Sequence, residues 1–182
     1  MITQPHYNLY TSGDRKSPNP STDKRKGEKM AGWPQMTFDF EKGYSHCFGC
    51  GRDNPIGLKL EFKWDGKTAK AEFTPTQFHQ GWSGIVHGGI IACLLDEAMG
   101  YATRFAGMNC VTAGIQVRLR RTALIGEPLI ITSSITENKR RLVKTQASIS
   151  LKDGVIVAEA TATQFVIKSK SRKVSPKGEN NA

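Results

Sequence analysis

The stretch that decides the fold reads His87-Gly88-Gly89-Ile90-Ile91-Ala92-Cys93-Leu94-Leu95-Asp96-Glu97-Ala98-Met99-Gly100. Its apolar residues recur at intervals of three and four, the period of one helical face, and helix-compatible residues continue to about Phe105. The stretch therefore predicts one long buried helix. Two features are unusual for a helix that only fills a core. It begins with a His-Gly-Gly triplet, and it carries the carboxylate of Asp96 among apolar residues.

The polar features of this helix point to a binding or catalytic site. The N–H groups of the glycines would lie at the positive end of the helix, without partners inside it. On a helical projection Gly89, Cys93, Asp96 and Gly100 share roughly one stripe. Small residues on that stripe would let another chain or a ligand approach closely, which makes Asp96 a candidate site residue.

The sequence on both sides of the helix alternates with a period of two, which predicts strands. The expected strands cover residues 58–64, 69–73, 115–120, 129–136 and 143–151, with a last strand ending near residue 167. Asp65-Gly66 and Asp153-Gly154 predict tight turns between neighbouring strands. Two strands, one helix and four strands fit an antiparallel sheet with a single long helix against one face. We therefore expect the α+β class.

Length and charge predict one domain with two basic extensions. The chain has 182 residues and a net charge of +10, of which +3 comes from residues 1–36, +4 from residues 168–182 and +3 from the middle. Both ends are rich in polar residues and have almost no apolar pattern, so we expect them to be disordered, with the domain over residues 37–167. Met30 and Met36 are alternatives to Met1 as the working start.

No apolar run approaches the ~20 residues of a membrane span, and no signal-peptide pattern is present, so we expect a cytoplasmic protein. The cysteines at 47, 50, 93 and 110 do not resemble a dense disulfide framework, and we expect them to be reduced. Cys47-Phe48-Gly49-Cys50 with His46 beside it suggests zinc. A single CxxC supplies only two ligands, however, so we expect no metal site and no cofactor.

Several motifs resemble the hotdog-fold acyl-CoA thioesterases of the PaaI-like group, in the 4-hydroxybenzoyl-CoA thioesterase superfamily. The strongest elements are Gly84-Ile85-Val86-His87-Gly88-Gly89 and the Leu95-Asp96 that follows, preceded by Cys47-Phe48-Gly49-Cys50-Gly51 and Asn54-Pro55-Ile56-Gly57-Leu58. The resemblance runs from about residue 47 to residue 167. It implies a sheet wrapped around the central helix, an acyl-CoA substrate, and a homodimer or a dimer of dimers.

Thioester hydrolysis needs a base or nucleophile near the carbonyl carbon and donors aimed at the carbonyl oxygen. Asp96 can be the first, and the N–H of Gly88 or Gly89 can be the second. Gly88 and Asp96 are about 12 Å apart along a helix, because each residue rises ~1.5 Å. They cannot reach one carbonyl from a single helix. An antiparallel second copy of the helix would solve this, so we predict a dimer with two composite sites.

The resemblance adds further site residues. His87 would orient the thioester or the helix entry, and Thr112 matches a hydroxyl that in some relatives helps to hold the attacking water. Many relatives carry an Asn where this chain has Gly81, and we take Gln80 beside it as a substrate-binding candidate. The residues that match positions where relatives bind the nucleotide and phosphates of CoA are Arg118, Arg120, Lys139, Arg140 and Arg141. Arginines alternating along a strand also suit a phosphorylated ligand.

Several alternatives stay open. The protein could bind an acyl-CoA without hydrolysing it, or could bind nucleic acid through its basic ends, which is the less favoured reading. A hydratase of the same fold is a weaker enzyme alternative. Glu97 is the rival carboxylate, but it projects about 100° away from Asp96 on a helix and we expect it to be structural. The length and type of the acyl group are not determined by the sequence.

Overall fold

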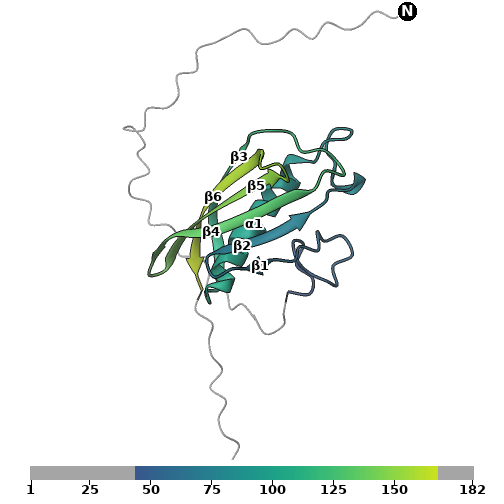
Figure 1. Ribbon diagram of the computed structural model, residues 1–182. Helices are drawn as coiled ribbons and strands as arrows, with labels where there is room; N and C mark the ends of the chain where they lie inside the picture. The colour runs from purple at the N-terminus through teal and green to yellow at the C-terminus, as the bar shows by residue number, and fades with distance from the viewer. Residues whose placement is uncertain (1–43, 168–182) are drawn as a thin grey trace, which may run out of the picture. The chain divides into compact units, whose positions relative to one another are not determined.

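The computed structural model describes residues 44–167 of the chain. The elements follow in the order β1 (Lys63–Trp64), β2 (Thr68–Phe73), η3 (Gln77–His79), α1 (Gly88–Phe105), β3 (Cys110–Leu119), β4 (Leu129–Lys139), β5 (Leu142–Leu151) and β6 (Ile156–Val166). All strand pairs are antiparallel, in one six-stranded sheet of order β1-β2-β4-β5-β6-β3, and α1 lies against one face of it (Figure 1). The predicted order and the α+β class are confirmed. The predicted extensions at 1–36 and 168–182, with Met30 and Met36, lie outside the described residues.

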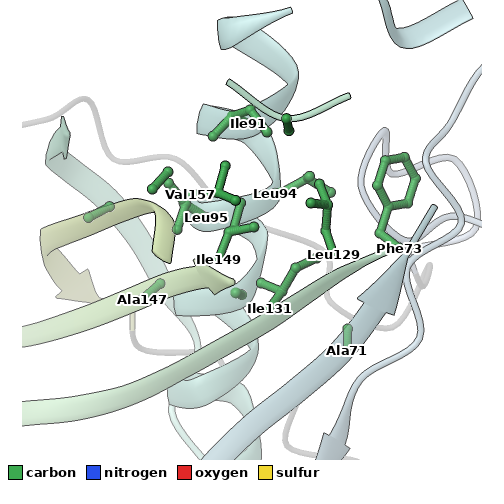
Figure 2. Packing of buried hydrophobic residues seen from close by; sticks show 14 of the residues in the cluster. Ala71, Phe73, Ile91, Leu94, Leu95, Leu129, Ile131, Ala147, Ile149 and Val157 are labelled. Atoms are coloured by element: carbon green, nitrogen blue, oxygen red, sulfur yellow. The ribbon is translucent and has the colours of Figure 1, made fainter. Parts of the chain in front are cut away.

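The predicted helix is present and forms the centre of the core. Leu94, Leu95 and Met99 are fully buried, and Figure 2 shows Leu94 and Leu95 directed toward strand residues such as Ile131 and Ile149. Burying side chains of this size stabilises the fold by roughly 1.5–3 kcal/mol each. The small residues of β6 opposite the helix let the strand lie close beneath it; these are Ala158, Ala160 and Ala162. No helix within residues 44–167 is long and apolar enough to cross a membrane.

The first predicted strand is wrong over residues 58–62. The alternating burial is there, since Leu58 and Leu60 are buried and Lys59 between them is exposed. However, the N–H groups of Leu58 and Leu60 donate to the carbonyls of Phe48 and Gly49, at 2.7 and 2.9 Å, and so are not available to a neighbouring strand. Lys59 also has a φ of 57°, which breaks the extended conformation. The alternation therefore reports contact with the core, and only Lys63–Trp64 pairs with β2.

Both predicted turns are confirmed. Gly66 and Gly154 have φ values of 96° and 88°, a region that glycine adopts without steric strain. The carboxylate of Asp65 accepts hydrogen bonds from the N–H groups of Lys67 and Thr68, at 2.8 and 2.6 Å. An Asp that bonds to backbone two residues ahead is a common way to close such turns.

The strand β3 forms one edge of the sheet, and along its length it pairs only with β6 among the described strands. Ile115 and Leu119 on this strand are 40% and 56% exposed, although both alternate toward the face that carries α1. Long edge strands with exposed apolar residues are templates for pairing with another chain. This edge therefore lacks a covering element within the described part of the chain.

Truncation of the core under α1 should destabilise the whole domain. Ile149 in the middle of β5 is fully buried, so Ile149→Ala should lower the free energy of unfolding by about 2–5 kcal/mol. The exposed Val155→Ala, in the turn before β6, should change it by less than about 0.5 kcal/mol. Urea unfolding followed by circular dichroism measures both. Equal midpoints for the two variants would contradict the described core.

Candidate active site

The helix α1 begins at a histidine cap. His87 is the N-cap residue, with φ −62° and ψ 133°, and its Nδ1 accepts the N–H of Gly89 at 2.9 Å. A side-chain acceptor at this position satisfies one of the four N–H groups that a helix leaves unpaired at its start. Because Nδ1 is the acceptor, the proton of the neutral ring is on Nε2. The structure therefore assigns His87 a defined role in fixing the helix entry.

Two glycines make room for the imidazole ring. A Cβ on Gly89 would lie 2.9 Å from the His87 Nδ1, and a Cβ on Gly81 would lie 3.1 Å from its Cδ2. A side chain at position 89 would displace the ring, and one at position 81 would require the ring to shift by a few tenths of an ångström. Gly81, the position where many relatives carry Asn, thus serves here as a close-packing site for His87. Gly88 differs, since its Cβ would meet only the Leu119 side chain, at 3.4 Å.

The arrangement distinguishes the two glycine N–H groups that the sequence left equivalent. The Gly89 N–H is engaged by His87, whereas the Gly88 N–H donates to no group among residues 44–167. Both glycines are exposed. An exposed N–H at the positive end of an 18-residue helix is a ready donor to an oxyanion. Of the two candidate donors, Gly88 is therefore the one that can receive a ligand without breaking the cap.

Asp96 lies two turns into α1 and is held by the edge strand. Its Oδ1 accepts the hydroxyl of Thr112 in β3 at 2.8 Å, and both side chains are half-buried. The register of β3 against β6 shifts between Thr112 and Gly114, so that Ala113 has no partner. Bulges of this kind redirect side chains and are frequent next to active sites. Two predicted site residues from distant positions are thus brought into contact.

A buried amide beside Thr112 was not predicted from the sequence. Gln164 in β6 pairs directly with Thr112, and residues paired in this way project from the same face of the sheet. Its side chain is 1% exposed, and its Oε1 has no hydrogen-bond partner among the described residues. The only sequence signal is a Gln at an inward position of an otherwise apolar alternation.

The loop before the helix carries two highly exposed aromatic side chains. Phe78 and Trp82 are 86% and 84% exposed, which is unusual for residues of this size. Gln80, the predicted substrate-binding residue, bonds within this loop, since its Oε1 accepts the N–H of Gly84 at 3.2 Å. Gln80 and Val86 also form an isolated β-bridge. In this arrangement Gln80 shapes the loop that leads into the helix.

The predicted phosphate-binding residues fall into two groups that a single chain does not bring together. Arg118 and Arg120 line a hollow of about 660 Å³ on the sheet face opposite α1, where Arg120 pairs with Glu159 at 2.8 Å. Lys139, Arg140 and Arg141 lie at the β4–β5 hairpin, and Lys139 pairs with Glu137. The pairing register puts the two groups about 20 Å apart at ~3.3 Å per residue.

Glu97 projects to another side of α1 and contacts the CxxC motif. The Cys47 thiol lies 3.7 and 3.6 Å from the two carboxylate oxygens of Glu97. Burial is the main cause that raises the pKa of Cys50 to about 12, and the neighbouring Glu97 carboxylate adds to it. The CxxC motif and Glu97 are each recognisable in the sequence, but the sequence does not predict that they are in contact.

Comparisons with known proteins identify the fold. Residues 83–158 match the thioesterase superfamily model. A solved thioesterase superfamily protein is 26% identical to this chain, with a TM-score of 0.64. The match covers 76% of this chain and 74% of that protein. A hypothetical thioesterase with coenzyme A from Streptococcus pneumoniae TIGR4 is 21% identical with a TM-score of 0.58, covering 62% and 91%. The E. coli PaaI protein of the phenylacetic acid degradation operon is 20% identical with a TM-score of 0.58, covering 62% and 82%. No curated protein matches this chain.

The predicted wrapping of the sheet around α1 is the hotdog arrangement that these solved structures share, and the resemblance drawn from the sequence motifs is confirmed. The superfamily match spans the loop before α1, the helix itself, and the chain as far as the early part of β6. It therefore includes His87, Gly88, Asp96 and Thr112.

The close packing around His87 predicts unequal effects of two neighbouring substitutions. Gly89→Ala would force the ring from the helix start, and the loss of an N-cap bond costs about 1 kcal/mol, or roughly 2–4 °C in melting temperature. Gly88→Ala meets only ordinary van der Waals contact with Leu119, so it should lower the melting temperature less. Differential scanning calorimetry of both variants measures the difference. Identical melting temperatures would contradict the described cap.

Proposed function

We propose that this protein, a thioester hydrolase with the PaaI-like hotdog fold, hydrolyses the thioester of an acyl-CoA to the free acid and CoA. The coenzyme A present in the Streptococcus pneumoniae thioesterase supports this substrate class. The observation that carries the proposal is the half-buried Asp96 carboxylate, which is oriented by Thr112 beside a bulge in β3. Such a carboxylate can accept a proton from water at a fixed position.

In the proposed reaction Asp96 acts as the general base. It takes a proton from a water molecule as the water oxygen bonds to the thioester carbonyl carbon, and the negative charge develops on the carbonyl oxygen. The Gly88 N–H donates to that oxygen. The tetrahedral intermediate then breaks its C–S bond, and the CoA sulfur receives the proton from Asp96. Direct attack by the Asp96 carboxylate is the alternative first step, and it uses the same donor.

Thr112 and His87 act on the positions of these groups. The Thr112 hydroxyl donates to Asp96 Oδ1, so its oxygen lone pairs remain free to accept a hydrogen bond from the attacking water. His87 holds the helix start through Gly89 and leaves the Gly88 N–H without an acceptor among residues 44–167. Both residues thereby fix the geometry of the base and of the donor, which is how positioned groups lower a barrier.

The proposed site needs two chains. Within one α1, Gly88 and Asp96 are about 12 Å apart at ~1.5 Å per residue, whereas reacting atoms must lie within roughly 3–3.5 Å. The exposed edge of β3, with Ile115 and Leu119, and the exposed Phe78 and Trp82 supply apolar surface for a second copy. We propose a homodimer in which Asp96 of one chain faces Gly88 of the other, with a dimer of dimers as the larger alternative.

The CoA moiety is proposed to contact basic residues. Arg118 is exposed on the sheet, and Arg140 and Arg141 are exposed at the β4–β5 hairpin. These two groups lie at different ends of the strands. One acyl-CoA would therefore contact one group from one subunit and the other group from the partner subunit. Gln80, in the loop before α1, would border the acyl group together with Phe78 and Trp82.

Removal of the proposed base should abolish turnover. With a panel of acyl-CoAs and a thiol reagent, the wild type should release CoA, and Asp96→Asn should reduce kcat by ~10²–10⁴-fold. Thr112→Val keeps the shape but removes a hydrogen bond to a charged group, and should cost ~10–100-fold. Glu61→Gln, an exposed carboxylate change outside the site, serves as the control and should be unchanged.

Three results would contradict the proposal. The first is an Asp96→Asn variant as fast as the wild type. The second is saturable stabilisation by acyl-CoA without thiol release, which would instead identify a binding protein. Salt-sensitive binding of nucleic acid with no activity on the panel would also count against the proposal.

A mixing experiment tests whether the site is shared between chains. Gly88→Pro removes only the proposed donor, because Pro is tolerated at the first helical position and His87 has the extended conformation that precedes proline. Losing one such donor should reduce kcat by ~10²–10³-fold. Random exchange of Gly88→Pro with Asp96→Asn subunits should restore about a quarter of wild-type activity, since half of the dimers are mixed and each holds one intact site.

If base and donor instead acted within one chain, neither subunit of a mixed dimer would hold a complete site. The mixture would then show no more activity than the average of the two variants. Mixing each variant with itself under the same exchange conditions controls for losses during dissociation. Mass photometry of the mixed sample reports whether dimers have formed.

A further inference from the structure

Three ligand-type side chains converge outside the proposed active site. The sulfur atoms of Cys47 and Cys50 and a carboxylate oxygen of Glu97 all lie within 4.8 Å of one another, and each residue is half-buried. The two cysteines come from the loop before β1, and Glu97 comes from α1, 50 residues further along the chain than Cys47. The segment that carries the cysteines is the dark blue one beside β1 in Figure 1.

The loop is built to hold both thiols toward the helix. Its turn is closed by the Gly51 N–H, which donates to the Cys47 carbonyl at 2.9 Å. A Cβ on Gly51 would collide with the backbone of Cys47, and a Cβ on Gly49 would collide with the Glu97 carboxyl group. Lys59 fixes the other side of the loop, because its ammonium group donates to the carbonyls of Gly51, Arg52 and Asn54. The backbone of this loop therefore lies unusually close to the Glu97 carboxylate.

The separation of Cys47 and Glu97 matches that of two ligands in a tetrahedral zinc site, and Cys50 lies within 4.8 Å of both. With Zn–S bonds of ~2.3 Å and Zn–O bonds of ~2.0–2.2 Å, two ligands of a tetrahedron are about 3.5 Å apart for S and O and about 3.8 Å apart for S and S. The Cys47 sulfur lies 3.6 Å from Glu97 Oε2 and 3.7 Å from Oε1. An ion between them would therefore need little rearrangement of the Cys47 and Glu97 side chains.

We propose that Cys47, Cys50 and Glu97 bind a zinc ion that fastens the segment before β1 to α1, with water in the fourth position. The structure supplies what the CxxC motif alone lacked, which is a further ligand at the correct distance. The role is structural. Glu97 and Asp96 are consecutive on α1 and diverge by about 100°, and Asp96 bonds to β3 on another side of the helix. The zinc site is thus independent of the proposed thioester hydrolysis.

Metal analysis of the full-length protein, purified under reducing conditions from zinc-supplemented medium, tests the proposal. The wild type should contain about one zinc ion per chain, and the Cys47→Ser, Cys50→Ser double variant less than about a tenth of that. Glu97→Gln exchanges a carboxylate for an amide of the same shape and should weaken zinc binding by at least ~10-fold in a chelator competition. Cys110→Ser changes another half-buried cysteine outside the cluster and should keep its zinc.

A second measurement does not depend on the variants folding. Wild-type protein stripped with a chelator should take up Co²⁺, giving the visible bands of tetrahedral cobalt and a thiolate charge-transfer band, and zinc should displace both. Zinc should also raise the melting temperature of the stripped protein. The proposal is overturned if the wild type contains no zinc and shows no cobalt bands. It is equally overturned if the double variant folds and retains the metal, because other residues then bind it.

Discussion

The rest of the structure depends on the burial of α1 against the sheet. Leu94, Leu95, Ala98 and Met99 are fully buried, so the helix cannot rotate about its axis without exposing several of them. With ~100° between successive residues, a fixed rotation sets the direction of every other side chain on α1. Asp96 is thereby directed to β3 and Glu97 to the segment before β1. The packing of the core thus determines that Asp96 contacts β3 and that Glu97 contacts the segment before β1.

Much of the fold is encoded locally and could be predicted. The period of the helix, its glycine-rich start and the alternation in β2 to β6 all reflect contacts that repeat along one element. The prediction failed at residues 58–62 because alternating burial needs only a core on one side, whereas a strand also needs a neighbour for its N–H groups. Here the N–H groups of Leu58 and Leu60 donate to the loop at residues 48–49, and no local pattern announces such a partner.

The candidate site likewise contains some residues that the local sequence predicts and others that depend on distant parts of the chain. His87, Gly88 and Asp96 were recognisable because a triplet of this kind and a carboxylate in a dry helix are anomalies within one stretch of sequence. Thr112 followed from resemblance alone, since its bond to Asp96 depends on the register of β3 and on the bulge after it. The contact between Cys47 and Glu97 spans 50 residues and was not predictable. The basic residues shared a charge pattern but not a location, because strand register separates them.

On one side of the described domain, several groups lack a partner or a cover among residues 44–167. The Gly88 N–H has no acceptor among residues 44–167, the outer edge of β3 has no neighbouring strand there, and Leu119 beside Gly88 is 56% exposed. Each feature alone would be unremarkable on a protein surface. Leu119 approaches the position of a Gly88 Cβ to 3.4 Å, so these features adjoin one another. A single antiparallel copy of the chain would cover the apolar edge of β3 and would also bring its Asp96 carboxylate toward the Gly88 N–H. Water could satisfy the hydrogen-bonding need of the N–H but would leave the apolar edge exposed. The same surface would therefore serve both the proposed association and the proposed catalysis, so the two halves of the proposed site can be separated along one rigid helix.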